Sequence, residues 1–232
     1  MLSSISYPNQ VVRLPRTGDP AINRNVGLAW ARTDYVAFLD DDDAWHPGKL
    51  ATQLRDIRAN RALVSASNAL RVTAGKVEGP YHLTSVRLPT LKDLLISNSI
   101  ITSSVLVRTE AMRAIGGFPL LRQGEDYAAW LRLSAIGIVS LLNETLVDYS
   151  MPAARSVSAT HDDLLRYEVF RDLHHWMQNS SFRLSRRLRT QVQGALYQES
   201  IRLGLTDAAR PSRTRARSRG VRRRRPSDSA RP

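Results

Sequence analysis

The sequence predicts an α/β fold, in which strands alternate with helices. Two runs rich in aromatic and β-branched residues, Tyr35 to Leu39 and Ile100 to Val107, have the composition and length of strands. Apolar residues recur at helical spacing in two other segments, Lys49 to Ala62 and Asp126 to Ile136. Strands and helices that follow one another in this way are typical of a layered α/β domain.

The bulk composition fits a globular protein and excludes several classes. The chain has 232 residues, of which 42% are hydrophobic and 24% charged, and this is enough for one sizeable core. It contains no cysteine, which excludes disulfides and thiolate metal sites. No apolar run approaches the roughly 20 residues that span a bilayer, and the first residues lack the pattern of a signal peptide. We therefore expect a cytoplasmic protein.

The positive charge is concentrated in a C-terminal tail. The net charge is +13, but Pro211 to Pro232 holds nine Arg and one Asp, a net charge of +8 that leaves +5 for the rest. Ala208 to Pro232 also has almost no apolar residues, so this basic tail is predicted to be disordered. Such a tail suits anionic lipid headgroups or RNA. An ending rich in Arg, Ser and Pro also arises from out-of-frame translation of GC-rich DNA.

The first half of the chain is punctuated by Pro and Gly up to Pro20 and is regular afterwards. Pro47 suits the start of a helix, and Ala74-Gly75 suits a turn. The predicted elements are a helix from Ala21 to Arg32, a buried strand from Tyr35 to Leu39, a helix from Lys49 to Ala62, and two short strands, Leu63 to Ala69 and Leu70 to Val77.

The second half is predicted by the same patterns. Thr109 is placed to cap a helix that Gly116-Gly117 closes. The predicted elements are a helix with Leu91, Leu94 and Leu95 on one face, a strand from Ile100 to Val107, a helix from Glu110 to Ile115, a helix from Asp126 to Ile136, and a strand from Gly137 to Tyr149. Two apolar stripes, Leu165 to Trp176 and Leu184 to Leu196, then predict a pair of helices packed on the domain.

Four consecutive carboxylates, Asp40 to Asp43, follow the first strand. They repel one another and cannot all be buried, so they need water, a cation or basic partners. The rim of an open α/β sheet is where ligands bind, and Mg²⁺ or Mn²⁺ takes carboxylate oxygens together with phosphate oxygens of a substrate. This chemistry suits a nucleotide diphosphate. The alternative is a solvated acidic turn.

A second acidic group, Glu125 and Asp126, lies at the start of a predicted helix. The helix dipole favours carboxylates there, so an acidic first turn without catalytic meaning is one interpretation. The other is a pair of carboxylates for acid-base chemistry, separate from the first group. Trp130 follows on the same helix, either as part of the core, which we favour, or as a platform for a sugar.

The segment FLDDDDAWHPGKLATQ resembles the DXD region of family 2 glycosyltransferases, which have the GT-A fold. The resemblance extends to NRNVGLAWARTDYVAFLDDDDAW before it and to NSIITSSVLVRTEAMRAIGGF and GEDYAAWLRLSAIG after it, in the expected order. It covers roughly Asn23 to Ser158. It implies a Rossmann-related mixed sheet in three layers, with helices on both faces.

The resemblance also implies a donor site. Asp40 and Asp41 would lie near the ribose, and Asp42 would bind Mg²⁺ or Mn²⁺. Arg24 and Asn25 match a family segment near the nucleotide. For Asn25 and for Asp43, the alternative to a ligand contact is helix capping, because short polar side chains of this kind accept backbone N–H bonds at the start of a helix.

The resemblance assigns the chemistry to Asp126 and Glu125. An inverting sugar transfer needs a carboxylate base that takes the proton of the acceptor hydroxyl as the hydroxyl attacks. Asp126 matches the family's base, and Glu125 would assist it or bind the acceptor. Asn98, Thr102 and Ser103 match positions that face the acceptor pocket.

The family normally opens with two strands that carry a Pro-Tyr-Asn-like motif and an Asp-Asp-Gly-Ser motif, and neither occurs here. We therefore expect a GT-A-like domain without its first strands at residues 1–158, a helical extension at 159–207 and the disordered basic tail at 208–232.

The expected function is metal-dependent, inverting transfer of a sugar from a nucleotide-diphosphate donor to a hydroxyl acceptor, either a glycan or a lipid-linked molecule, in cell-envelope polysaccharide synthesis. The alternative is a truncated, inactive remnant or partner-binding module. We expect a cytoplasmic protein with peripheral contact to the inner face of the membrane through the basic tail. Nucleic acid is not the expected partner, because the body of the chain has no basic stripe with interleaved aromatics.

Overall fold

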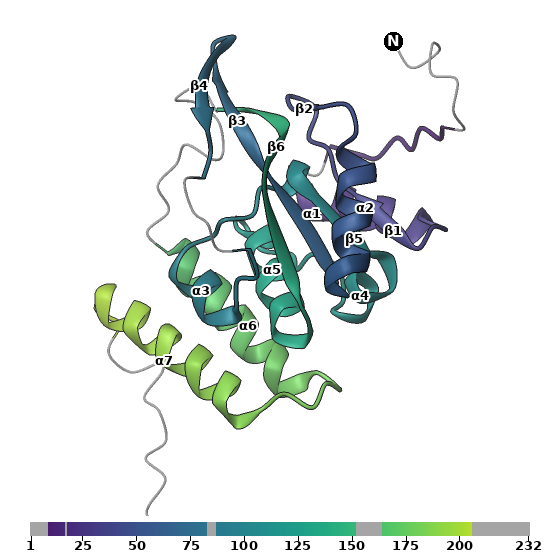
Figure 1. The fold of residues 1–232 in the computed structure, drawn as a ribbon. Helices are drawn as coiled ribbons and strands as arrows, with labels where there is room; N and C mark the ends of the chain where they lie inside the picture. The colour runs from purple at the N-terminus through teal and green to yellow at the C-terminus, as the bar shows by residue number, and fades with distance from the viewer. Residues whose placement is uncertain (1–8, 17, 83–86, 152–163, 206–232) are drawn as a thin grey trace, which may run out of the picture.

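The structure, a computed structural model, describes residues 9–16, 18–82, 87–151 and 164–205. A six-stranded sheet forms its centre, with helices on both faces (Figure 1). The strands are β1 (Tyr35–Ala37), β2 (Ala44–Trp45), β3 (Val64–Thr73), β4 (Lys76–Pro80), β5 (Val105–Arg108) and β6 (Val139–Ser150). The helices are α1 (Pro20–Trp30), α2 (Lys49–Asn60), α3 (Leu91–Ile96), α4 (Thr109–Ala114), α5 (Glu125–Ile136), α6 (Leu165–Asn179) and α7 (Arg186–Arg202), with a 3-10 turn, η2 (Thr102–Ser104).

The sheet is mixed, as expected. Its order is β1-β5-β3-β6-β2, with β4 paired to the far end of β3. Among the strand pairs of the described residues, only β3 and β6 run parallel, and the other pairs are antiparallel. β1 lies at an edge of the sheet, so the aspartates that follow it stand at the rim.

Alternating side chains of the strands face two different helical layers. Val105 and Val107 of β5 belong to the main core, which also contains Trp130 of α5. Leu106, between them, packs instead against Ile57 of α2 in a smaller cluster. Trp130 is fully buried, which confirms that it is a core residue. The expected three-layer arrangement, with α2 on one face and α1 and α5 on the other, is confirmed.

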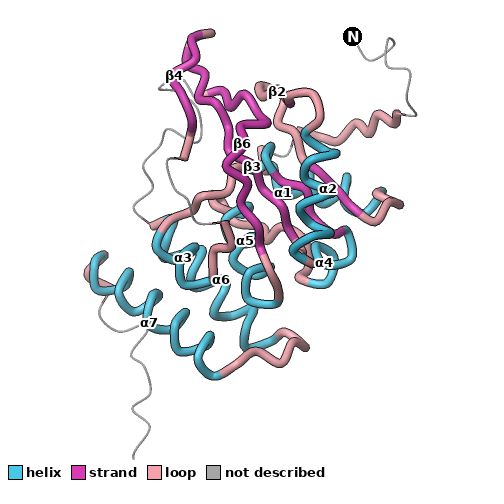
Figure 2. Tube along the Cα trace, in the orientation of Figure 1, coloured by secondary structure: helices cyan, strands magenta, loops and turns pink. Residues whose placement is uncertain are grey.

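The pair of helices predicted after residue 164 is also confirmed. α6 and α7 lie side by side (Figure 2); α6 packs on α5, and α7 packs on α6 and α3. Val169 and Leu173 of α6 and Val192 of α7 are fully buried. Nη2 of Arg132 on α5 donates to both carboxylate oxygens of Asp172 on α6, at 2.9 and 2.7 Å, and this ion pair joins the two helices.

Two strand predictions need correction. Leu63 to Ala69 and Leu70 to Val77 are not two strands, because β3 continues to Thr73 and the hairpin turn comes only at Ala74 and Gly75. Both turn residues have positive φ, 49° and 78°, as a tight hairpin requires. The error arose because β3 runs beyond the end of β5 and there pairs with β4, a change of partner that strand composition does not reveal.

Ile100 to Val107 is not a single strand either. Thr102 to Ser104 form the 3-10 turn, in which Ser104 Oγ donates to the Ile101 carbonyl, and β5 begins only at Val105. A hydroxyl that bonds to its own backbone competes with a sheet ladder. Thr109 does not cap α4: its Oγ1 is buried and has no hydrogen-bond partner among the described residues.

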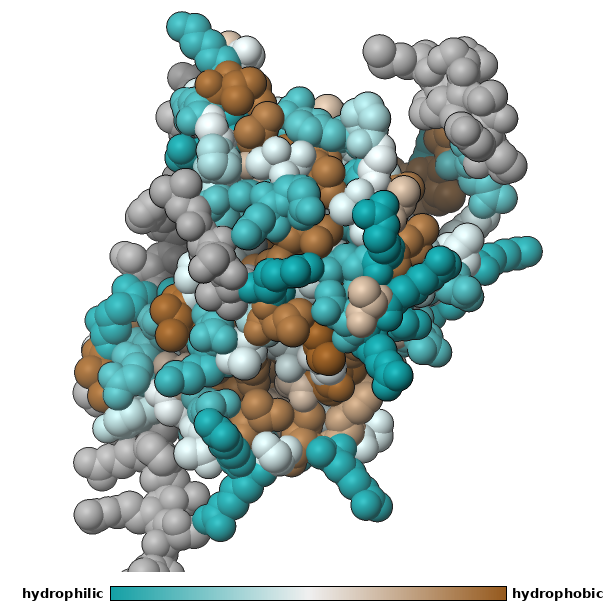
Figure 3. All heavy atoms as spheres, viewed as in Figure 1, coloured by the Kyte–Doolittle hydropathy of each residue, from teal (hydrophilic) through white to brown (hydrophobic). Residues whose placement is uncertain are grey.

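The described surface is mixed in character. The face in Figure 3 carries several small hydrophobic areas separated by polar side chains. None of the helices in the described ranges is long and apolar enough to cross a membrane. The basic tail from Ala208 onward and the proposed boundaries near residues 158 and 207 lie outside the described residues, so these stay predictions.

Candidate functional site

A pocket of about 590 Å³ opens where α1, the end of β1, the start of α5 and the ends of β4 and β6 meet. Of the predicted site residues, it brings together Arg24, Asp40, Glu125 and Asp126, which come from three separate segments of the chain. Thr102 and Asn98, predicted to face an acceptor, line the same pocket. Asp40, the first aspartate of the run, and the α5 carboxylates therefore belong to one site, whereas Asp41 to Asp43 do not line this pocket.

Arg24 joins the two acidic groups. Its Nη2 lies 2.9 Å from Asp40 Oδ1 and its Nη1 lies 2.6 Å from Glu125 Oε1. The guanidinium also lies over the ring of Phe118, 5.6 Å from its centroid. Arg24 thus takes a forked position that only a planar cation with several donors can hold.

The charged groups of Arg24 and Glu125 are partly buried. Burial alone would lower the pKa of Arg24, but Asp40 and the α5 carboxylates outweigh burial, and the pKa is raised above its ordinary value. Burial, and then the neighbouring charge of Asp126, raise the pKa of Glu125, against the opposing effect of Arg24. Glu125 is therefore ion-paired with Arg24 in a partly desolvated environment.

Asp126 is held in a different way. Its Oδ2 accepts a hydrogen bond of 2.8 Å from Thr102 Oγ1, and no ion pair engages it among the described residues. Both carboxylates line the pocket, but Asp126 is only half-buried whereas Glu125 is buried. The geometry thus separates the two carboxylates: Glu125 fixes Arg24, and Asp126 faces the space in which a ligand would lie.

The other aspartates of the run lie on the turn that follows β1. Asp41 and Asp42 are exposed, and their side chains form no hydrogen bond with other described residues. Asp43 does not cap α2, which begins after Gly48 without a side-chain cap; its Oδ1 instead accepts from Ser150 N at 2.9 Å. Burial raises the pKa of Asp43, and its Oδ2 is buried without a hydrogen-bond partner in the described part of the chain.

This donor set fits a hard divalent cation. Free carboxylate oxygens on Asp42 and Asp43 are the ligands that Mg²⁺ and Mn²⁺ prefer, and an orphaned buried oxygen is satisfied by a cation. Within the described ranges, no three His, Cys, Asp or Glu side chains form a complete metal cage. Mg²⁺ commonly needs only one or two carboxylates when a substrate phosphate supplies further oxygens.

Asn25 is placed differently from the other predicted residues. Its Nδ2 donates to the Phe118 carbonyl at 2.8 Å, and its Oδ1 accepts from Phe118 N at 2.9 Å. It is not a helix cap, because Asp19 caps α1 through the backbone N–H of Ala21. Asn25 does not line the pocket, and both ends of its amide hold the loop before α5. Its predicted contact with a nucleotide remains a prediction without a geometric basis.

Sequence reasoning missed two tyrosines of the pocket. Tyr81 follows β4, and Tyr149 is the penultimate residue of β6. No local pattern marks either residue, because the strand pairing alone brings them together. Leu165 and Arg166 of α6 also line the pocket, so the C-terminal helices contribute one of its walls.

Comparison with protein families identifies one domain in the chain. Residues 2–115 match the model of glycosyl transferase family 2. The matched region contains Arg24 and the aspartate run and ends before Glu125 and Asp126.

Several curated proteins resemble the chain in sequence. It is 33% identical over 141 residues to the Escherichia coli UDP-Glc:alpha-D-GlcNAc-diphosphoundecaprenol beta-1,3-glucosyltransferase WfaP, with 59% of this chain and 53% of the relative covered. It is 29% identical over 142 residues to the Bacillus subtilis putative teichuronic acid biosynthesis glycosyltransferase TuaG, with 61% and 56% covered. The chain thus spans about half the length of the curated relatives it matches.

Solved structures share the fold. S. aureus TarS 1-349 in complex with UDP-GlcNAc superposes with a TM-score of 0.60 at 19% identity, with 82% of this chain and 55% of TarS covered. Its complex with UDP gives a TM-score of 0.57. This likeness confirms the GT-A-like fold expected from the sequence. The family match and the sequence relatives show that the chain belongs to glycosyl transferase family 2.

Proposed function

We propose that the chain transfers a sugar from a nucleotide-diphosphate donor to a hydroxyl acceptor with inversion at the anomeric carbon. One observation carries the proposal: Arg24 binds Asp40 and Glu125 at once, so that the first aspartate of the run and the α5 carboxylates line a single pocket. Two separate carboxylate groups are what such a transfer needs, one near the departing diphosphate and one near the acceptor. Because WfaP is named for UDP-Glc and TarS was crystallised with UDP-GlcNAc, a UDP-sugar is the proposed donor.

Asp126 is the proposed base. The acceptor oxygen attacks the anomeric carbon, the bond from that carbon to the diphosphate breaks, and the hydroxyl proton passes to Asp126. Thr102 Oγ1 donates to Asp126 Oδ2 and Tyr127 N donates to Asp126 Oδ1, so the carboxylate is held through both oxygens, and each oxygen keeps a further lone pair for this proton. Glu125 cannot serve equally well, because its carboxylate is buried and ion-paired with Arg24. It is proposed to position Arg24 and, through it, the start of the aspartate run.

Asp42, aided by Asp40, is proposed to hold Mg²⁺ or Mn²⁺, and Asp43 offers a further oxygen beside it. When bound, the cation would neutralise the diphosphate as it leaves. Asp40 and Asp41 are proposed to lie near the ribose. Asp40 already shares one oxygen with Arg24, so its second oxygen is the one that remains for a ligand.

The cellular setting is also part of the proposal. The names of TuaG and WfaP concern teichuronic acid and a diphosphoundecaprenol-linked sugar, and they support a role in cell-envelope polysaccharide synthesis. We propose that the chain works in the cytoplasm at the inner face of the membrane, where its basic tail would meet anionic lipid headgroups.

Calorimetric titration with UDP and with GDP, each with and without Mn²⁺, tests the donor site. We expect UDP to bind in a Mn²⁺-dependent manner and Asp42→Ala to abolish that dependence. Asp34→Ala is a matched control, because Asp34 is also exposed and precedes the same strand but lies outside the run. If a folded chain binds neither nucleotide, the transferase proposal is wrong and a non-catalytic binding module is left.

A further inference from the structure

Two tyrosines form one wall of the pocket beside the proposed base. The rings of Tyr81 and Tyr149 lie perpendicular to each other, with centroids 5.5 Å apart. One side of the pair packs against a small apolar cluster formed by Ala69, Ile101 and Val147. Both residues are half-buried and both line the pocket that holds Asp126. The tyrosines therefore combine a packed side with a side open to a ligand.

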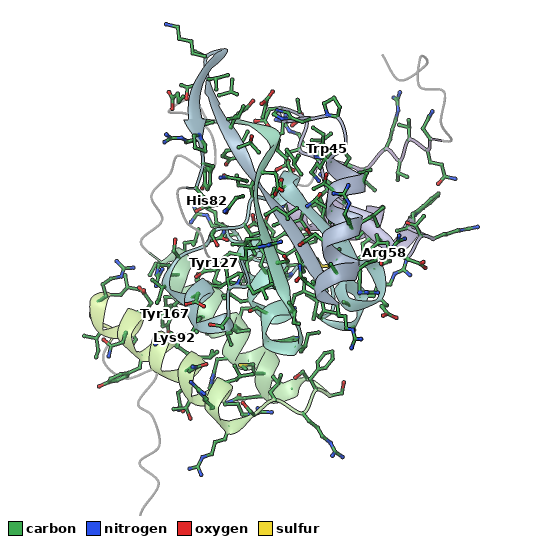
Figure 4. All side chains as sticks on the ribbon, viewed as in Figure 1. Trp45, Arg58, His82, Lys92, Tyr127 and Tyr167 are labelled. Carbon is green, nitrogen blue, oxygen red and sulfur yellow. The ribbon has the colours of Figure 1, made fainter. Side chains whose placement is uncertain are left out.

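The position of Tyr81 is fixed by its backbone and by its neighbour. Tyr81 N donates to the Ala69 carbonyl at 2.7 Å. The side chain of Asn68 holds the next residue, His82, by accepting from its N–H at 3.0 Å and donating to its carbonyl at 2.9 Å. His82 lies where β4 ends (Figure 4), and its ring touches that of Tyr81. Contacts of this kind make a side chain rigid before a ligand arrives.

Tyr149 is fixed by the sheet. It pairs with Arg71 of β3 in the parallel ladder, and the following N–H, that of Ser150, donates to Asp43. Burial is the main cause that raises the pKa of Tyr149 to about 12, with smaller effects from Tyr81 and from carboxylates that include Asp126. At neutral pH the phenol is therefore protonated and able to donate a hydrogen bond.

The phenol hydroxyls are the polar groups of this wall. Within the described residues, the hydroxyls of Tyr81 and Tyr149 form no hydrogen bond. An unused hydroxyl on a rigid aromatic ring offers an apolar surface and a polar tip together. A pyranose ring is complementary to this wall, because its C–H groups form an apolar face and its hydroxyls surround the rim.

We propose that Tyr81 and Tyr149 form the acceptor subsite and that the acceptor is the hydroxyl of a pyranose sugar. This inference rests on the proposed transferase function and narrows its acceptor to a glycoside. Asn98 and Thr102, which line the same pocket, complete the subsite with polar groups. The sugar would lie against the tyrosines with one hydroxyl directed at Asp126.

The test is binding of defined glycosides to the full chain by saturation-transfer NMR in the presence of UDP and Mn²⁺. The probes are methyl β-D-glucopyranoside and methyl N-acetyl-β-D-glucosaminide, with glycerol as a hydroxyl compound that has no ring. We expect one or both glycosides to bind and glycerol not to bind. Tyr81→Ala and Tyr149→Ala should each weaken the glycoside by about tenfold or more, and Tyr149→Phe by less, because the ring remains.

The control is Tyr197→Ala on α7, a half-buried tyrosine outside the pocket, which should bind glycoside as the wild type does. UDP affinity, measured by calorimetry on every variant, should stay unchanged. If UDP binds but neither glycoside does, or if the glycoside binds equally well to both alanine variants, the acceptor inference is wrong while the transferase proposal stands. If UDP does not bind to the wild type, both fall. If Tyr149→Ala does not fold, Tyr149→Phe and Tyr81→Ala decide the question.

Discussion

Arg24 Nη1 lies 2.6 Å from Glu125 Oε1, although the two residues are 101 positions apart in the sequence. The side chains are 15% and 9% exposed, so the pair is largely removed from water. A buried pair of this kind adds little stability of its own, but removal of one partner leaves an uncompensated charge. Arg24 and Glu125 therefore make the geometry of the pocket and the stability of the fold depend on each other.

Arg24→Met should lower the free energy of unfolding by about 3 kcal/mol, because it leaves the buried Glu125 unpaired. Chemical denaturation followed by circular dichroism measures this change. The double variant Arg24→Met/Glu125→Gln should be more stable than Arg24→Met, since the unpaired charge is then removed. Arg183→Met, which replaces an exposed arginine, is the control and should be neutral. Equal stability of Arg24→Met and the control would contradict the prediction.

The amide of Asn25 predicts a cost for a side chain at Gly117. A Cβ on Gly117 would lie 2.5 Å from Asn25 Oδ1, and φ there is 72°. Gly117→Ala should therefore break the hydrogen bonds between Asn25 and Phe118 in addition to straining the backbone.

Gly116→Ala is the matched comparison, because Gly116 also has a positive φ, 89°, but its Cβ would meet only Arg132 Nη1 at 3.9 Å. We expect Gly116→Ala to cost about 1 kcal/mol from backbone strain alone and Gly117→Ala at least about 1 kcal/mol more. Thermal and urea unfolding of both variants measures the difference. Equal losses would mean that the clash with Asn25 is relieved without cost.

The hydrogen bond from Thr102 to Asp126 predicts a separation between binding and chemistry. Asp126→Asn should reduce kcat of sugar transfer by about 10² to 10⁴ while UDP binds with unchanged affinity. Thr102→Val should reduce kcat less, about tenfold, and Thr102→Ser, which keeps the hydroxyl, should restore it. Transfer rates with a UDP-sugar and the glycoside that binds measure these effects. Full activity in Asp126→Asn would exclude Asp126 as the base.

Local patterns predicted most elements of the fold but not their pairing. The helix from Glu125 to Ile136 follows from apolar spacing and acidic residues at its start, and both lie within one segment. The partners of β3 depend instead on residues 76–80 and 105–108, so the strand was divided in the wrong place. The 3-10 turn at Thr102 was missed for the same reason, since IITSSVLV has strand composition throughout.

In the candidate site, too, the residues marked by local sequence were predicted, and those placed by strand pairing were not. Arg24, Asp40, Glu125 and Asp126 were found because they lie in segments that resemble a known family, and the structure brings all four to one pocket. Asn25 lies in an equally suggestive segment, but its amide is bonded to the backbone of Phe118 and does not line the pocket. Tyr81 and Tyr149 carry no local signal, because only the β3-β4 hairpin and β6 together place them.

Lys49 predicts how stability depends on pH. It is 2% exposed, its Nζ has no hydrogen-bond partner among the described residues, and it lies 4.2 Å from the centroid of the Trp45 ring. Burial lowers its pKa from 10.5 to about 7. Below pH 7 both the folded and the unfolded chain carry the charge, so the full cost of burying it is present. Between pH 7 and 10.5 only the unfolded chain is protonated, and the cost disappears as pH rises.

Lys49→Met should therefore be more stable than the wild type below pH 7, because the methionine fills similar space without a charge. The advantage should shrink by up to about 1.4 kcal/mol per pH unit above pH 7, as the wild type loses the proton on Lys49. Lys92→Met is the control, because Lys92 is exposed, on α3 (Figure 4), and its replacement should show no such trend. Urea unfolding of the three proteins from pH 6 to pH 9 measures the trend. An advantage of Lys49→Met that stays constant across this range would show that Lys49 keeps its ordinary pKa in the folded chain.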